Sequence, residues 1–329
     1  MLILLNLSYC SEGITISPWT DIFKGVQHAT GWTDVPRLQR VNAIRIDTQD
    51  PDIAFYTTPS NGALPRDTTW QTGSQFMASS GVQVAINSHF FVPLDEEYKD
   101  LLGVSVSNGQ IVSALENRND RARTLLITQN NQASFQHTYT STNLSGIWTA
   151  VESFSYILVN GVPWIDYADP LAINPHPRSA VGLSYDGRYM ILLTIDGRQT
   201  GYSEGATFYE ESLWLIRFGA YNGLNFDGGG SSHILISDGY GGSTTLNSPS
   251  ENRAVGSHLG VYAAPLPLEF PGDYEPDGDV DFLDFAWFAA DWLKTSNFNP
   301  ISDMHNSEDD IIDLFDLSVF AQNWLNGLN

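Results

Sequence analysis

The stretch "SAVGLSYDGRYMILLTID" (Ser179–Asp196) contains two apolar runs on either side of Asp186-Gly187. An Asp-Gly pair between apolar runs predicts a two-residue type I′ hairpin turn. With these two residues as the turn, paired residue numbers sum to 373, so Arg178 lies opposite Ile195. The same register brings "HPRS" (176–179) next to "DGRQ" (196–199).

A helix is expected after the hairpin. Thr207 and Glu210 have the spacing of a capping box, in which each residue's side chain accepts from the other's backbone N–H. The following residues as far as Phe218 are rich in apolar side chains, and Gly219 is a helix stop signal.

The segment "LNFD" (224–227) is predicted to be a strand, which completes a β-α-β unit with strand 189–196 and the helix. The two strands of such a unit run parallel, so Asp196 and Asp227 are expected at the same edge of a sheet. Ligands bind at this kind of edge. The strand "GVQVAIN" (81–87) also ends on polar residues and is a candidate for the same edge.

A glycine run follows the second of these strands. Gly228, Gly229 and Gly230 are followed by Ser231 and Ser232. Consecutive glycines can present unshielded N–H groups in an arc that binds a phosphate or carboxylate, and the serine hydroxyls add donors. The run has neither the Gly-Lys-Ser/Thr of a P-loop nor the GxGxxG of a dinucleotide site. A tight turn without a ligand is the alternative.

Five segments along the chain are "VAINSHFF", "HPRSAVGL", "DGRQTGYSEGAT", "GLNFDGGGSSHIL" and "RAVGSHLGVY". Their order resembles that found in the phosphodiester glycosidase family. The chain resembles this family over about 80–264, and "RIDTQDPDIAFYTTPSNG" upstream extends the likeness. Ser88, His89 and His233 depart from the family's usual residues, so the resemblance does not imply a particular sugar. It implies hydrolysis of a sugar C1–O–phosphodiester bond and an α+β fold with a mixed β-sheet, a β-α-β unit and hairpins.

That reaction needs a carboxylate as base or nucleophile and a proton shuttle. The candidates are Asp227, Asp196, Glu204, His176 and His258. Each has a simpler interpretation: Asp196 as a turn residue, Glu204 as a solvated side chain, and His258 as a core histidine. No cofactor is needed for this chemistry as far as the sequence shows.

The phosphate of such a substrate needs cationic and N–H-rich contacts. Arg178 and Arg198 are expected to clamp it bidentately, although Arg198 can also be read as a surface arginine. Asn87 and the run Gly228–Ser232 complete the expected binding residues.

The C-terminal segment contains a repeat. "DGDVDFLDFAWFAADWL" (277–293) and "DDIIDLFDLSVFAQNWL" (309–325) align at an offset of 32 residues. The first copy has the oxygen-rich spacing of a calcium loop, with Gly278 at the position of the sharp turn. A helix with apolar residues on one face is expected after each loop, and none before it.

Two loop-plus-helix units resemble a type I dockerin. That resemblance implies calcium-dependent folding and docking to a cohesin-like scaffold protein. The predicted ligands are Asp273, Glu275, Asp277, Asp279 and Asp284 in the first copy, and Asp303, Asp309 and Asp316 in the second. The second copy is irregular because Asp310 replaces the glycine.

Composition defines the remaining expectations. The net charge of -23 disfavours nucleic acid as a partner, and Cys10, the single cysteine, excludes an intrachain disulfide.

The Pro-bearing "AAPLPLEFPG" (263–272) places the boundary between a catalytic domain at 14–267 and a tail at 268–329. Residues 1–13 are apolar without a basic start, which indicates an atypical or clipped export signal or a buried strand. Calcium loops favour an extracellular or periplasmic location, and no segment is long and apolar enough to span a membrane.

Three function classes stay open from sequence. The first is a secreted phosphodiester glycosidase acting on a carbohydrate that carries a phosphodiester. The second is a hydrolase of another glycosidic bond in a polysaccharide, and the third is a non-catalytic glycan-binding protein assembled on a scaffold.

Overall fold

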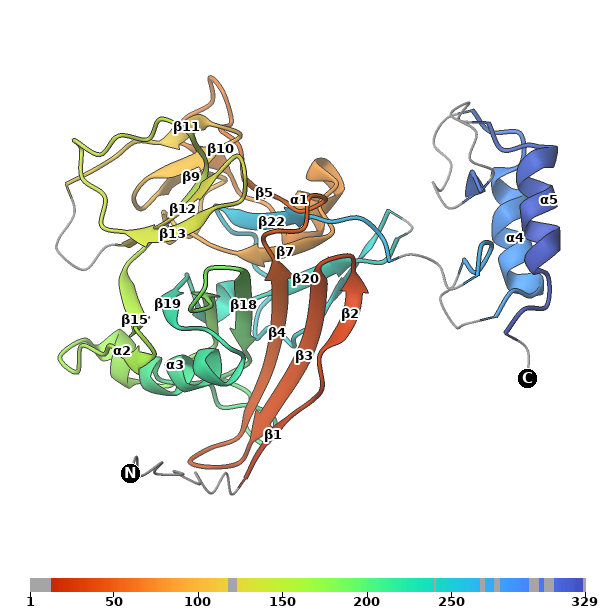
Figure 1. Cartoon of the computed structure of the whole chain (residues 1–329). Helices are drawn as coiled ribbons and strands as arrows, with labels where there is room; N and C mark the ends of the chain where they lie inside the picture. The colour runs from red at the N-terminus through yellow and green to blue at the C-terminus, as the bar shows by residue number, and fades with distance from the viewer. Residues whose placement is uncertain are drawn as a thin grey trace, which may run out of the picture. The chain divides into compact units, whose positions relative to one another are not determined.

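The computed structural model describes residues 13–117, 123–239, 241–266, 270–274, 279–295, 302–304 and 311–327. The chain separates into two compact units, Met1–Pro265 and Leu266–Asn329. Figure 1 shows both units, coloured by residue number. Strands build most of the larger unit, and the described part of the smaller unit contains two α-helices.

A nine-stranded sheet forms the frame of the larger unit. Its strand order is β1-β3-β4-β18-β17-β19-β15-β16, and β2 pairs with β3. These strands are β1 (Ile14–Ile16), β2 (Thr20–Phe23), β3 (Val26–Thr33), β4 (Gln39–Asp47), β15 (Ser155–Val159), β16 (Val162–Pro163), β17 (Arg178–Leu183), β18 (Tyr189–Ile195) and β19 (Asn222–Asn225).

Three smaller sheets complete this unit. One five-stranded sheet is β11 (Gln110–Ser113), β10 (Ser105–Ser107), β14 (Ile147–Ser153), β12 (Arg123–Thr128) and β13 (Ala133–Gln136). The other is β21 (Ser243–Thr245), β20 (Ile234–Ser237), β7 (Val84–Asn87), β22 (His258–Tyr262) and β5 (Ala54–Thr57). The three-stranded sheet is β6 (Thr68–Thr69), β9 (Tyr98–Leu101) and β8 (Phe91–Val92). The helices are α1 (Gly73–Ser80), α2 (Pro170–Ile173), α3 (Phe208–Arg217) and the short 3-10 turn η1 (Gly229–Ser231).

The predicted hairpin is present as β17 and β18. Arg178 pairs with Ile195, the register that the Asp186-Gly187 turn requires, and Gly187 has a φ of 72°. The capping box of α3 is also present, with the Thr207 and Glu210 side chains each accepting from the other residue's backbone N–H. The turn itself is not the expected type I′, which needs a positive φ at both Asp186 and Gly187. Only Gly187 has one, and the Gly187 N–H donates to Ser184 O over 3.1 Å, so the chain reverses over Ser184–Gly187. The hairpin register and the capping box were therefore predicted correctly, and the turn type was not.

The β-α-β unit differs from the expected one in a single respect. β18 and β19 run parallel, but each pairs with β17, which lies between them and is antiparallel to both. The hairpin partner fills the place beside β18, so the chain crosses over through α3 to the far side of β17. Every strand pair that the structure describes is antiparallel, so the expected mixed sheet is wrong. Asp196 and Asp227 still follow their strands at the same edge of the sheet.

The two faces of the large sheet pack against different partners. Alternate residues such as Val181, Leu192 and Leu224 join a core cluster with Ile86 and Leu259 of the five-stranded β7 sheet. The opposite face, including Leu193, packs against α3 through Trp214 and Leu215. Burying each side chain of this size stabilises the fold by roughly 1.5–3 kcal/mol before the loss of conformational entropy. The two cores hold the edge that bears Asp196 and Asp227 rigidly.

In the smaller unit, α4 (Phe282–Asp291) and α5 (Leu314–Asn323) each begin with an acidic capping box. Phe288 and Phe320 are buried, and their rings stack with centroids 5.3 Å apart. Val280 and Ile312 complete the centre of this small core. The matched apolar positions of the two copies therefore meet in one cluster.

The 32-residue repeat is visible in the backbone hydrogen bonds. The Val280 N–H donates to Asn326 O over 2.9 Å, and the Ile312 N–H donates to Lys294 O over 3.2 Å. Each bond follows from the other by adding 32 to one residue number and subtracting 32 from the other. Each copy of the repeat therefore donates an equivalent backbone hydrogen bond to the other copy.

Candidate functional site

Each glycine after Asp227 is needed at a different close approach. A Cβ on Gly228 would lie 2.8 Å from Pro177 O. Gly229 has a φ of +65°, and a Cβ there would lie 2.9 Å from a guanidinium nitrogen of Arg198. A Cβ on Gly230 would lie 2.5 Å from the carboxyl carbon of Glu251. The glycine run therefore makes room for an arginine and a glutamate, which side chains at these positions would displace.

Backbone N–H groups of the run are largely engaged within the protein. The Gly228 N–H donates to Asp227 Oδ1 at 3.0 Å, and the Gly229 N–H donates to Pro177 O at 2.9 Å. Two N–H groups of the expected anion nest therefore already have acceptors. The glycines open the site mainly by lacking side chains.

Asp227 is half-buried and lies two residues beyond the end of β19. Surrounding protein atoms raise the pKa of its carboxyl group to about 6, and this rise is opposed by the Ser231 hydroxyl, the Gly228 N–H and the charge of Arg253. The Ser231 hydroxyl lies close to the carboxylate without reaching hydrogen-bond geometry. A carboxyl group with a pKa near 6 is ionised at neutral pH and gains a proton readily, as a catalytic base requires.

Asn87, at the end of β7, fixes the backbone around Asp227. Its Nδ2 donates to Asp227 O at 2.5 Å, and its Oδ1 accepts from the Ser179 hydroxyl at 2.7 Å and the His233 N–H at 3.1 Å. Asn87 is fully buried. The strand 81–87 thus contributes to the same edge as the hairpin, in a supporting position rather than as a free ligand.

Asp196 is buried and holds a neighbouring loop. Its carboxylate accepts from Asn247 Nδ2 at 2.9 Å, from the Ser248 N–H at 3.0 Å, and from the Tyr202 hydroxyl at 3.4 Å. Burial raises the pKa of Asp196, and these three donors counteract the rise. Because its oxygens accept hydrogen bonds from two loops, Asp196 holds residues 247–248 in position.

Arg178 does not fit its predicted role as a phosphate clamp. It is 1% exposed, and its guanidinium donates to the carbonyls of Ala206, Leu171 and Asn174 at 2.6–2.8 Å. Side chains alternate between the two faces of a strand. The Arg178 side chain therefore points toward α3, whereas the Asp196 side chain lies on the opposite face of the sheet.

A buried carboxyl group lies near Arg178. Glu211 is 0% exposed, and burial raises the pKa of its carboxyl group to about 8 against the opposing effect of Arg178. The Arg178 guanidinium also lies 4.5 Å from the centre of the Phe208 ring. These contacts join β17 to α3, so Arg178 has a structural role.

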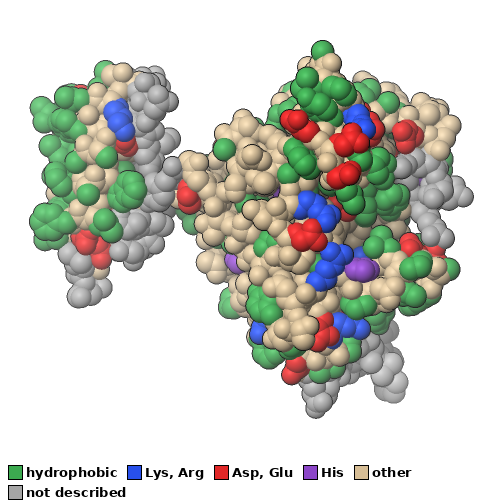
Figure 2. All heavy atoms as spheres, turned by 180° about the vertical axis from the view of Figure 1, so that it is seen from behind, with side chains coloured by type: hydrophobic (Ala, Val, Ile, Leu, Met, Phe, Trp, Pro, Cys, Tyr) green, Lys and Arg blue, Asp and Glu red, His purple; other side chains and the backbone are tan. Residues whose placement is uncertain are grey.

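Arg198 and a second arginine, Arg253, are the cations of the site. Arg198 has a φ of 61° and contacts the glycine run, and Arg253 acts electrostatically on Asp227. Glu251 lies between them, with Oε1 3.5 Å from Arg198 and Oε2 2.5 Å from Arg253. On the larger unit, the face seen in Figure 2 shows basic and acidic side chains beside a histidine. Arg253 begins the "RAVGSHLGVY" segment, the one sequence signal that pointed to it.

His176 is half-buried, and burial together with the charges of Arg178 and Arg198 lowers its pKa. Its backbone pairs with Ala206. The predicted site therefore includes His176 near Arg198 as a neutral imidazole at neutral pH.

His258 lies deeper than expected for a proton shuttle. It is 0% exposed and stacks on Phe76 of α1, with ring centroids 4.8 Å apart. Its other neighbour is His233, at 5.1 Å between centroids. Burial lowers the pKa of His258 well below its usual value and that of His233 to about 4, so both rings are neutral.

The remaining predicted residues differ in access. Glu204 is exposed in the loop before α3, and its backbone N–H donates to Leu38 O. No described hydrogen bond or ion pair joins its carboxylate to the other predicted residues. Ser231 and Ser232 are buried, and neither hydroxyl makes a hydrogen bond within the described part of the chain.

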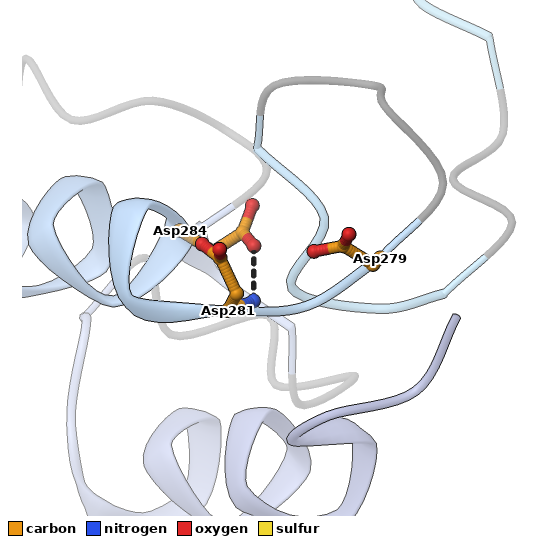
Figure 3. A group of neighbouring side chains, drawn as sticks. All are labelled: Asp279, Asp281 and Asp284. Carbon is orange, nitrogen blue, oxygen red and sulfur yellow. Dashed lines mark hydrogen bonds between the residues drawn. The ribbon is translucent and has the colours of Figure 1, made fainter. Parts of the chain in front are cut away.

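Three carboxylates converge in the smaller unit, as Figure 3 shows. Ligand oxygens of Asp279, Asp281 and Asp284 lie within 4.8 Å of one another. Asp284 is fully buried, and its oxygens accept from the Asp281 and Tyr274 N–H groups. A group of hard oxygen ligands with a buried member suits a calcium ion.

The other predicted calcium ligands are only partly described. Asp273 and Asp316 are buried, and Asp303 is described beside Ser302. Asp316 accepts from the Asp313 N–H, the counterpart of the Asp284 bond in the first copy. Glu275, Asp277 and Asp309 lie outside the described residues, as does nearly all of the expected export signal at 1–13.

Comparison with known proteins gives one family, and solved structures with a similar fold at low sequence identity. The phosphodiester glycosidase family model matches residues 80–262, more than half of the chain. The zebrafish N-acetylglucosamine-1-phosphodiester alpha-N-acetylglucosaminidase catalytic domain, auto-inhibited by its pro-peptide, is similar with a TM-score of 0.56 and 14% identity. That similarity covers 76% of this chain and 88% of that one.

A hypothetical protein from Synechocystis is also similar, with a TM-score of 0.51 and 15% identity, covering 75% of this chain and 64% of that one. The chain thus spans less than two thirds of the Synechocystis protein. These likenesses show a shared fold. No curated protein matches the chain.

Among the described residues, no helix has the length and apolar character needed to cross a bilayer. The family match contains the β7 strand, the hairpin, α3, the glycine run and β22, which together build the site described above. The chain belongs to the phosphodiester glycosidase family.

Proposed function

We propose that the larger unit hydrolyses a sugar C1–O–phosphodiester bond, with an α-N-acetylglucosaminyl phosphodiester as the first substrate to test. The observation that carries this proposal is the position of Asp227. A carboxyl group with a pKa near 6 lies at the start of a glycine run, and that run contacts Arg198.

The leaving group of this reaction is a phosphomonoester, which is far less basic than an alcohol and needs little protonation. The reaction instead needs a carboxylate at the sugar and cations at the phosphate. Asp227 supplies the carboxylate as base or nucleophile. Arg198 and Arg253 supply the cations, since guanidinium groups bind phosphate oxygens bidentately.

The other residues support this arrangement. Asn87 fixes the Asp227 backbone, and Asp196 fixes the loop that precedes Glu251 and Arg253. The neutral His176 near Arg198 can accept a proton. Ser231 and Ser232 offer hydroxyls at the glycine run.

A substrate screen tests the reaction class. The full chain is incubated with sugar 1-phosphodiesters, with the corresponding neutral aryl glycosides, and with polysaccharides. We expect release of a phosphomonoester from one of the phosphodiesters and no cleavage of the neutral glycosides. Cleavage of neutral glycosides alone would assign another glycosidase activity, and sugar binding without turnover would assign a binding protein.

For the smaller unit we infer a calcium-binding, type I dockerin-like module in a secreted protein, with a cohesin-like scaffold protein as its partner. The convergence of Asp279, Asp281 and Asp284 supports calcium. Exposed apolar side chains at equivalent positions of the two helices support a protein partner. They are Phe282 and Leu283 on α4, and Leu314 and Phe315 on α5. Calcium-dependent capture by a purified cohesin tests this assignment.

A further inference from the structure

Glu251 occupies the place in which an anion would bind. Its carboxylate lies against Gly230, between the guanidinium groups of Arg198 and Arg253. Carboxylate and phosphate oxygens compete for the same guanidinium donors. The protein's own carboxylate therefore stands where the phosphate of a substrate is expected.

The contact is weak enough to be displaced. The side chains of Arg198, Glu251 and Arg253 are 46%, 44% and 30% exposed. Ion pairs with this much solvent access stabilise a protein by about 0–1 kcal/mol each. A phosphate held by two arginines can thus move the Glu251 side chain aside while Glu251 stays nearby.

The charges match a phosphodiester better than its product. Arg198, Arg253 and Glu251 sum to one positive charge, and the ionised Asp227 nearby brings the sum to zero. Each negative charge beyond the single one of a phosphodiester is therefore less favourable. A phosphomonoester carries about -1.5 to -2 at pH 7. Asp227 adds to the repulsion of a dianion, because Arg253 lies close enough to act on it.

We propose that Glu251 is a specificity-determining residue that competes with phosphate for Arg198 and Arg253 and thereby selects the monoanionic phosphodiester over the dianionic phosphomonoester. The inference rests on the proposed function, because the two anions are its substrate and product. Its consequence is rapid product release. Without Glu251, the two arginines would hold the phosphomonoester after cleavage.

The test compares two probes in the Glu251→Gln variant, which keeps the side-chain size and removes the charge. Inorganic phosphate at pH 8 represents the dianion, and diethyl phosphate represents the monoanion. Calorimetric titration of the full chain should show at least about tenfold tighter binding of inorganic phosphate in the variant, equivalent to about 1.4 kcal/mol. Diethyl phosphate should gain clearly less.

Two controls locate the effect. Asp52→Asn removes an equally exposed carboxylate, paired with Lys24, and should leave the affinity for both probes unchanged. Arg253→Gln should weaken both probes. Thermal melts confirm that each variant is folded.

Equal gains for both probes, no gain for inorganic phosphate, or no phosphate binding by either protein would overturn the role of Glu251. These titrations need no turnover, so they separate the two proposals. Phosphodiester hydrolysis with an unchanged Glu251→Gln variant contradicts only the selection role. The predicted binding pattern without hydrolysis contradicts only the proposed reaction.

Discussion

The Asn87 side chain donates a 2.5 Å hydrogen bond to the carbonyl oxygen of Asp227, and so joins the β7 sheet to the edge of the nine-stranded sheet. The Asp227 N–H completes the junction by donating to Ser88 O. The proposed catalytic carboxylate therefore lies on backbone fixed by two sheets. Such backing keeps a reactive group in position without ordering it at each turnover.

The pH dependence of turnover should report the raised pKa of Asp227. Burial raises this pKa from 3.8 to about 6, so the ionised fraction falls as the pH drops below 6. We expect kcat/KM to fall about tenfold per pH unit below about 6. A profile that stays flat down to pH 4.5 would contradict the assignment of Asp227 as an essential carboxylate.

The stability of the folded protein should depend on the ionisation of Asp227 in the opposite sense to turnover. Because the folded-state pKa is raised, the ionised carboxylate opposes folding as the pH rises from 3.8 to 6 and above. Asp227→Asn should therefore raise the melting temperature at pH 7 and have no such effect near pH 3.5. Melts of both proteins at the two pH values measure this, and they also serve as the folding control for the kinetics.

Arg178→Ala should destabilise the fold. The substitution removes the donor to three carbonyls and the cation near buried Glu211. Leaving a buried acceptor without its donor costs about 1–3 kcal/mol. Chemical denaturation should show this loss, whereas Arg253→Gln should melt close to the wild type and lose affinity for phosphodiester. The reverse pattern would return the phosphate role to Arg178.

Gly229→Ala should impair substrate binding beyond its effect on stability. Gly229 has a φ of +65°, and a methyl group would press on Arg198. Gly62→Ala is a matched control, because Gly62 has a φ of +73° and no atom within 4 Å of a Cβ. Both variants should lose about 1–2 kcal/mol of stability from the left-handed backbone. Only Gly229→Ala should raise KM for a phosphodiester; an equal KM in both variants would remove the glycine run from the site.

Calcium removal should unfold the smaller unit and spare the larger one. Without a cation, Asp279, Asp281 and Asp284 repel one another within 4.8 Å, which opposes closure of the loop over Phe288. Calorimetry of the full chain in excess chelator should lose or shift one transition. Asp284→Asn should weaken the response to calcium. A calorimetric trace and helical ellipticity that chelator leaves unchanged would contradict the calcium site.

Deleting residues 268–329 should leave turnover within about threefold of the full chain, because the chain separates into two compact units near this boundary. Steady-state kinetics of the truncated protein measures this. A soluble truncated protein with no activity would show that the tail contributes to the catalytic unit.

Local signals in the sequence predicted the elements around the site better than the contacts within it. The hairpin around Asp186-Gly187 and the Thr207–Glu210 capping box involve residues close in sequence, and the hairpin register and the capping box are present as expected. The turn type is not, because Asp186 does not have the positive φ of a type I′ turn. The hairpin register correctly brought Arg178 beside the segment of Asp196. Register does not say which face a side chain takes, and Arg178 points to α3.

The Glu251 and Arg253 contacts were beyond sequence reasoning because long-range closure creates them. Their loop lies between β21 and β22 and reaches the glycine run. The loop is held there by Ser248, whose N–H donates to Asp196, a residue 52 positions earlier in the chain. The sequence indicated that the three glycines must approach something. The structure shows that Gly229 and Gly230 approach Arg198 and Glu251.

The most direct test of the proposed reaction compares the wild-type chain with Asp227→Asn on an α-N-acetylglucosaminyl phosphodiester, followed by phosphorus NMR at pH 7. The wild type should release the phosphomonoester, and Asp227→Asn, folded by thermal melt, should be slower by at least about a hundredfold. Equal rates for the two proteins, or no release from this or any other sugar 1-phosphodiester, would contradict the account.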